Sequence, residues 1–168
     1  MAYDDHFRLA DDYISRLDMV MGGIADPFMK SRYTGFLAVS AVTVYELALK
    51  TIFQEFAEGK HKVLAVFSSA YFRRINGRIR IEVIRKEYTK RFGDKYSNRF
   101  DKKLKDCERR TLQSHRESVK SSYENIITWR NEFAHEGIIP ATPTYDEVKK
   151  AYTFGKEVIH CLAQSMKR

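Results

Sequence analysis

Apolar residues recur every three or four positions along most of the chain, the spacing that places them on one face of an α-helix. This pattern predicts a first helix from about Asp4 to Met21, ended by Gly22-Gly23. It predicts a second helix from about Lys30 to Ala57, with Asp26-Pro27 before it in a loop. The stretch from Phe36 to Leu49 is apolar almost all round, so we expect the second helix to be the central, most buried element.

The middle of the chain has a less regular pattern. A third helix is expected from Val63 to Ile75, followed by a turn at Asn76-Gly77. Residues 79 to 83 alternate apolar and charged positions as in a strand, but the longer apolar pattern from Ile75 to Phe92 favours a helix. Gly93-Asp94 ends it, and a highly charged helix is expected from Phe100 to Leu112.

The last third of the chain predicts two more helices. One runs from about Ser118 to His135 and is ended by Gly137, after which Pro140 and Pro143 keep the backbone extended. Thr144 is the expected N-cap of the last helix, and Glu147 completes a capping box. The apolar face of this helix consists of Val148, Tyr152, Gly155, Ile159, Leu162 and Met166. We therefore predict an all-α fold, a single-domain bundle of five to seven helices over residues 1–168.

The composition narrows the class of protein. With three prolines and eight glycines, the 168-residue chain has too few turn residues for an all-β sandwich. Its two cysteines exclude a disulfide scaffold and a thiolate zinc cluster; Cys161 is expected to pack in the core and Cys107 to be exposed. We see no signal peptide, and the longest apolar stretch, Gly35 to Leu49, is too short to span a membrane. A cytoplasmic protein without membrane contact is expected.

The net charge of +8 is concentrated in one segment. Residues 73–110 contain 15 basic and six acidic residues, a net charge of +9, while the rest of the chain carries 15 basic and 16 acidic residues. Such a run is either a solvated charged surface or a contact surface for the RNA backbone, and we favour the second interpretation. The candidate RNA-binding residues are Arg73, Arg74, Arg78, Arg80, Arg85 and Lys86.

The candidates for catalysis are few. The chain lacks a Gly-rich phosphate loop, a His-Glu-x-x-His zinc helix and a Gly-x-Ser-x-Gly elbow, and we expect neither a metal nor a cofactor. Arg130 and His135 remain. An imidazole can take the proton from a ribose 2′-hydroxyl or donate one to the leaving 5′-oxygen, and a guanidinium can hold the phosphate.

The spacing of this pair is weak by itself, because the chain has 15 arginines and five histidines, and Arg110 and His115 repeat it. The surroundings of the two pairs differ. Arg130 and His135 end an otherwise apolar and aromatic helix that precedes a capped closing helix, whereas Arg110 and His115 straddle a polar break. We therefore favour Arg130 and His135 as the catalytic pair.

The segment Arg130-Asn131-x-x-Ala134-His135-x-Gly137, in the penultimate helix of a small all-α domain, resembles the HEPN superfamily, and most closely its stand-alone bacterial RiboL-PSP-like members. A long apolar second helix with an acidic residue, here Glu46, is similar to theirs. The resemblance covers the whole chain as architecture, but its specific motif spans only residues 130–137. The basic helical insertion at 73–110 matches no motif of the family.

The resemblance implies a metal-independent endoribonuclease, acting as a toxin or in phage defence by abortive infection. It implies that Arg130 and His135 are catalytic, that Asn131 supports them, and that a homodimer forms the RNA-cleaving site. It also implies an antitoxin, often of the nucleotidyltransferase type, whose acidic surface could use the basic segment.

Several alternatives stay open. Glu46 either orients Arg130 or is a boundary residue that reaches solvent. Trp129 and Phe133 could stack on a base, but packing in the core or a dimer is the stronger interpretation of their spacing. The alternative function is a non-catalytic HEPN-like module that binds RNA, a nucleotide or a protein partner.

Overall fold

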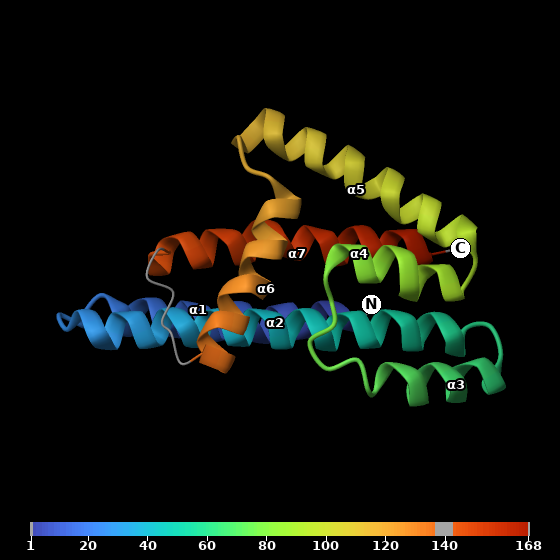
Figure 1. Cartoon of the computed structure of the whole chain (residues 1–168), viewed down its shortest axis with the longest axis horizontal. Helices are drawn as coiled ribbons and strands as arrows, with labels where there is room; N and C mark the ends of the chain where they lie inside the picture. Colours follow the sequence, from blue (N-terminus) through green and yellow to red (C-terminus); the bar gives the residue numbers. More distant parts are fainter. Residues whose placement is uncertain (1, 137–142, 168) are drawn as a thin grey trace.

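The computed structural model describes residues 2–136 and 143–167, except for the side chains of residues 135 and 136. All regular structure within this part of the chain is helical (Figure 1). The elements are α1 (Tyr3–Met21), α2 (Pro27–Glu58), α3 (Lys62–Phe72), α4 (Ile81–Val83), the π-helix η1 (Ile84–Thr89), α5 (Asp94–His115), α6 (Val119–Glu136) and α7 (Tyr145–Met166). The predicted all-α bundle is confirmed.

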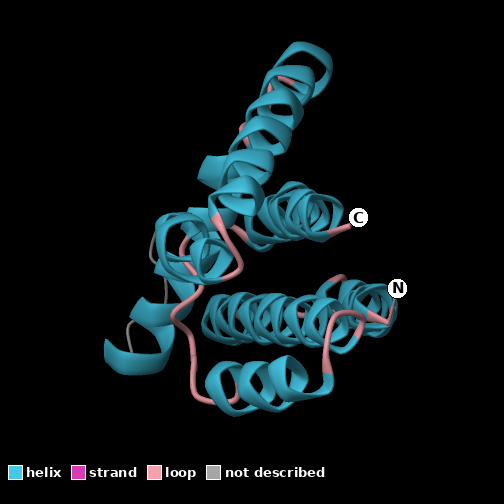
Figure 2. Cartoon of the chain, turned by 90° about the vertical axis from the view of Figure 1, so that its right-hand side faces the viewer, coloured by secondary structure: helices cyan, strands magenta, loops and turns pink. Residues whose placement is uncertain are grey.

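Helix α2 is the centre of the bundle, as its apolar sequence predicts. It packs against α1, α3, α6 and α7, whereas α5 lies away from it at the edge of the molecule (Figure 1 and Figure 2). Its first turn differs from the prediction. Pro27 belongs to the helix instead of a loop, because Asp26 is an extended N-cap whose side chain accepts a 3.0 Å hydrogen bond from the Phe28 amide. A proline is favourable at this first position, since its missing N–H has no partner there anyway.

Helix α2 also contains an 18-residue window apolar enough to cross a membrane, with a mean hydropathy of 1.6, although the stretch from Gly35 to Leu49 alone is shorter. Half of this window is buried inside the bundle. Leu37, Ala48 and Leu49 are fully covered by neighbouring helices. The hydropathy of α2 is therefore accounted for by its place in the protein core.

The segment between α3 and α5 departs most from the sequence prediction. Helix α3 ends at Phe72 rather than Ile75, the turn predicted at Asn76-Gly77 is present, and the helix expected to include Ile79 begins only at Ile81, so residues 75–80 form an irregular loop. The loop is held by side chains from elsewhere: Tyr88 Oη donates to the Arg78 carbonyl at 2.6 Å and Tyr123 Oη to the Ile79 carbonyl at 2.8 Å. These two backbone carbonyls thus have hydrogen-bond partners without helix formation, so the segment can stay irregular while Ile75 and Ile79 are buried.

Helix α5 is longer at both ends than predicted and lies antiparallel on α7. The prediction that Cys107 is exposed is wrong, since only 5% of it is accessible to solvent. Cys107 faces α7, with its Sγ atom 4.0 Å from Glu157 Oε2, and the Cys161 Sγ atom lies 3.6 Å from the Lys103 carbonyl. Cys161 is buried, as expected, and burial raises the pKa of its thiol.

The C-terminal prediction is confirmed where the structure describes it. Helix α6 has the expected bounds, Thr144 and Glu147 form the predicted capping box, and every predicted apolar-face residue of α7 is buried. Gly137 and Pro140 lie outside the described residues.

A cluster of buried tyrosines fixes α6 and α7 on α2. The Tyr45 ring stacks on Tyr123 and on Tyr152, with centroids 4.9 and 5.9 Å away. Its hydroxyl donates to the Tyr152 carbonyl at 2.9 Å, and burial raises the pKa of Tyr45 well above its ordinary value. Gly155 leaves room for this hydroxyl, because a Cβ there would lie 2.5 Å from it. The cluster sets the position of α6, which carries the candidate catalytic residues.

Candidate functional site

Arg130 and Asn131 lie near the C-terminal end of α6 and are both half-buried. The Arg130 Nη1 atom donates a 2.9 Å hydrogen bond to Asn131 Oδ1. Position 135 follows Asn131 by about one helical turn, so these two positions lie on the same side of α6. The backbone of His135 is helical, and its side chain lies outside the described residues.

Gly77 lies directly against the Arg130 guanidinium. A Cβ atom on Gly77 would overlap Nη2 and would lie 3.3 Å from both Nη1 and Cζ. Gly77 also has a φ angle of +73°, which side chains other than glycine rarely adopt. Sequence reasoning placed a turn here but did not connect it to Arg130. Only glycine satisfies both the backbone conformation and the close approach of the arginine.

Glu46 reaches the same place from α2. Its Oε2 atom accepts a 2.6 Å hydrogen bond from the Gly77 amide, and its Oε1 atom forms a 2.6 Å ion pair with Lys50. The Glu46 side chain is 18% exposed, so it lies between the core and the solvent. No hydrogen bond or ion pair joins Glu46 to Arg130 among the described residues. Glu46 therefore touches Arg130's neighbour, Gly77, rather than Arg130.

Helix α6 holds the other end of the loop. Glu124 accepts a 2.9 Å hydrogen bond from the Ile81 amide and forms a 2.6 Å ion pair with Arg80. Arg80 Nη2 also lies 3.4 Å from Thr128 Oγ1. The loop is thus attached to α6 on the N-terminal side of Arg130, and Glu46 of α2 holds it opposite Arg130. These contacts hold the loop beside the Arg130 guanidinium, and none of them involves the guanidinium itself.

The Arg130 guanidinium has no carboxylate within ion-pair distance in the described part of the chain. Its hydrogen-bonding capacity is only partly used, because a guanidinium has five N–H donors and one donates to Asn131. A half-buried guanidinium in this state can bind an anion such as a phosphodiester with two parallel hydrogen bonds.

Most of the predicted RNA-binding residues are paired with carboxylates. Arg78 lies 3.1 Å from Glu87, and Arg85 lies 2.5 Å from Glu82, which also pairs with Lys86. Arg80 pairs with Glu124, as described above. Arg73 and Arg74 are exposed and have no carboxylate partner among the described residues. A role of these six residues in RNA binding stays a prediction.

Arg110 and His115, which repeat the spacing of the candidate pair, lie at the end of α5 and are both exposed. His115 Nδ1 is 2.7 Å from Ser114 Oγ, and its ring lies 5.5 Å from the Phe154 ring. Both side chains are exposed, whereas the Arg130 guanidinium lies against Gly77. The sequence context that favoured Arg130 therefore corresponds to a real structural difference.

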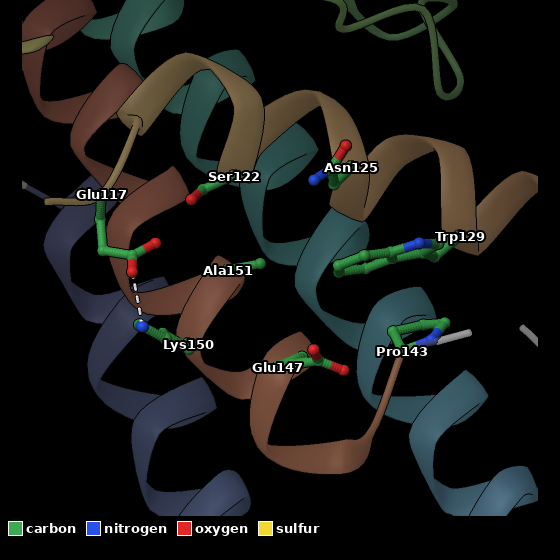
Figure 3. A pocket seen from close by; sticks show the side chains of 8 residues that line it. All are labelled: Glu117, Ser122, Asn125, Trp129, Pro143, Glu147, Lys150 and Ala151. Atoms are coloured by element: carbon green, nitrogen blue, oxygen red, sulfur yellow. Dashed lines mark ion pairs between the residues drawn. The ribbon is translucent and has the colours of Figure 1, made fainter.

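An open cleft between α6 and α7 lies beside this site (Figure 3). Trp129 and Pro143 lie next to each other on one side, and the 2.5 Å ion pair of Glu117 with Lys150 lies on the other. Glu147 also lines the cleft, so its two carboxylates outnumber its one ammonium group. This charge disfavours a phosphate there.

Trp129 and Phe133 pack within the chain rather than standing free. Trp129 is partly buried against the core. Phe133 lies edge-on to Phe36 with centroids 5.5 Å apart, and a Cβ on Gly35 would overlap its ring. The packing interpretation of these two aromatic residues therefore fits the structure.

In the described part of the chain, no three His, Cys, Asp or Glu side chains lie close enough together to hold a metal ion. The chemistry available around Arg130 is that of a cation, an amide and the positioned backbone of the loop.

Comparison with known families identifies the class of protein. The family model described as RiboL-PSP-HEPN matches residues 7–168, which is nearly the whole chain. The chain therefore belongs to the RiboL-PSP-HEPN family, and it is a HEPN domain, as its motif and helical bundle suggested. No curated protein and no solved structure matches it significantly.

Proposed function

We propose that this HEPN domain is a metal-independent endoribonuclease in which Arg130 and His135 cleave RNA. One observation carries the proposal: Arg130 is held between Asn131 and Gly77, yet no carboxylate of the described chain neutralises it. A guanidinium that is held in place but has no carboxylate partner is suited to binding the phosphate of a ligand.

The reaction needs only groups that this chain supplies. The 2′-oxygen of a ribose attacks the adjacent phosphorus, the bond from phosphorus to the 5′-oxygen breaks, and a 2′,3′-cyclic phosphate and a 5′-hydroxyl form. His135 takes the 2′ proton as a neutral imidazole, and the imidazolium that forms gives it to the leaving 5′-oxygen; a histidine can play both parts near neutral pH. Arg130 binds the phosphate and stabilises the charge that builds up on it, while Asn131 directs the guanidinium.

Helix geometry supports a site shared by two chains. Five positions along an α-helix correspond to about 140° around its axis and about 7.5 Å along it. Residues 130 and 135 therefore start from different sides of α6. A homodimer that brings two α6 helices together would place the arginine of one chain near the histidine of the other.

The biological role that we propose is that of a toxin or phage-defence effector in the cytoplasm. Uncontrolled RNA cleavage harms the cell that makes the enzyme, so an antitoxin partner, of the nucleotidyltransferase type or another, is part of this proposal. The support for it is the family to which the chain belongs.

The test is cleavage of RNA in EDTA by the purified protein and by its His135→Ala and Arg130→Ala variants. We expect the wild type to cleave and each variant to lose at least about 100-fold in rate, the usual effect of removing an acid–base group or a donor to a developing charge. Equal activity in all three proteins, or none in the wild type, would contradict the proposal. A wild-type protein that does not cleave RNA would favour the alternative function, a non-catalytic binding module.

A further inference from the structure

The outer face of α5 carries a row of exposed cations, most of which have no carboxylate partner among the described residues. Lys95, Lys102, Lys105 and Arg109 are separated by seven, three and four residues, so they follow one side of the helix. We call these four residues the basic stripe. All four are exposed, and Asn98 is the residue between the first two on the same side. The stripe contains no acidic residue and extends over about 21 Å of helix.

The stripe faces away from the rest of the molecule. The opposite side of α5 is buried through Phe100, Leu104 and Cys107, which pack on the bundle. Figure 1 and Figure 2 show α5 at the edge of the molecule, with only one side against its neighbours. A long partner could therefore lie along the stripe without moving any other element.

Three cations of the stripe differ from three of those between α3 and α5. Arg78, Arg85 and Lys86 pair with glutamates, whereas Lys95, Lys102 and Lys105 have no carboxylate partner in the described part of the chain. Arg109 alone in the stripe has one, Asp106, at 3.3 Å. Three cations without a carboxylate partner therefore lie along one exposed helix face.

We propose that the basic stripe binds the phosphodiester backbone of RNA, independently of its sequence. Lysines in a row neutralise successive phosphates and release the counterions condensed on them, which is the main source of sequence-independent affinity. The proposal rests on the proposed function only in taking RNA as the ligand. The stripe holds the strand, while Arg130 and His135 act on it elsewhere.

An acidic protein is the weaker candidate for this surface. Protein interfaces have an apolar centre and contain little lysine, and their affinity depends on a few buried anchors. Leu112 is the one large apolar residue that α5 exposes, and it lies beyond the stripe. Exposed apolar residues gather instead on α3, where Val63, Val66 and Phe67 are each more than 60% exposed.

The experiment compares two variants that lose the same charge. One is Lys95→Gln/Lys102→Gln/Lys105→Gln, and the matched control is Arg16→Gln/Lys30→Gln/Lys62→Gln, which removes three exposed cations of α1, α2 and α3. Both are made in a His135→Ala background, and binding of a labelled RNA is measured by fluorescence anisotropy in EDTA from 50 to 400 mM salt. Binding is thus measured without cleavage, so a failed ribonuclease proposal does not decide the result.

We expect the stripe variant to lose affinity and its slope of log K against log salt to become shallower by about 2, which corresponds to three lost phosphate contacts. The control variant should keep the slope of the parent protein. An unchanged slope in the stripe variant, or an equal loss in both variants, would overturn the proposal. Retained RNA binding by the stripe variant together with lost binding of an acidic protein partner would also overturn it, in favour of a protein surface.

Discussion

Replacing Gly77 by alanine tests whether the loop holds Arg130 in place. The added Cβ would overlap Nη2, so the guanidinium must move by about 1 Å to regain ordinary contact, and a misplacement of this size can cost about 100-fold in rate. The positive φ angle of Gly77 adds a backbone cost of about 1–2 kcal/mol. We therefore expect a large loss of RNA cleavage with a small loss of stability.

Gly93 provides the matched control. Its φ angle is +116°, so alanine is strained there too, but no atom of the described residues lies within 4 Å of a Cβ at that position. RNA cleavage in EDTA and thermal unfolding are measured for both variants. We expect Gly93→Ala to lower the melting temperature while keeping the rate of cleavage.

Cleavage by Gly77→Ala at the wild-type rate, despite a lowered melting temperature, would show that the loop does not position Arg130. An equal loss of activity in both glycine variants would show the same, since general destabilisation would then explain the effect.

Three further predictions concern stability and access. The Glu46→Gln variant keeps an oxygen that can accept from the Gly77 amide but loses the negative charge. Hydrogen bonds to charged groups are the stronger ones, so we expect its melting temperature to be about 2–4 °C lower. An unchanged melting temperature would show that the charge is unimportant. Thr144→Ala should lower the melting temperature by a similar amount through loss of the cap, with cleavage unaffected. The backbone and hydroxyl of Thr144 lower the pKa of Glu147 below its ordinary value of 4.5, so the carboxylate stabilises the fold above that pH. As the pH falls through the lowered pKa, this stabilisation is lost, and the difference between Thr144→Ala and the wild type should shrink. Cys161 should react with a thiol reagent only when the protein unfolds, because it is buried and burial raises its pKa; rapid labelling of the folded protein would contradict this.

Local sequence rules predicted the parts of the fold that local interactions determine. The helices with a continuous apolar face, and the capping box at Thr144, were placed correctly because their spacing and their cap lie within a few residues of each other. The candidate arginine was found in the same way, from the apolar helix that surrounds it.

The environment of Arg130 could not be predicted in this way. The loop at 75–80 depends on Tyr88, Tyr123 and Glu124, which are close to it in space but not adjacent in sequence. The turn at Asn76-Gly77 was predicted, but Ile75 and Ile79 fit the helical pattern on either side of it, so the length of the loop was not. Cys107 was misplaced for a similar reason, since its burial depends on contact with α7 rather than on its charged neighbours.

The central position of α2 has a consequence for synthesis on the ribosome. Helix α2 is complete at Glu58, but α7, which covers one of its sides, begins only at Tyr145. At about 5–20 residues per second, the translating chain exposes this apolar helix for several seconds before its cover exists. Tyr45 can bond to the Tyr152 carbonyl only after that interval. Until then the nascent chain is partly folded, with an exposed apolar helix of the kind that chaperones bind.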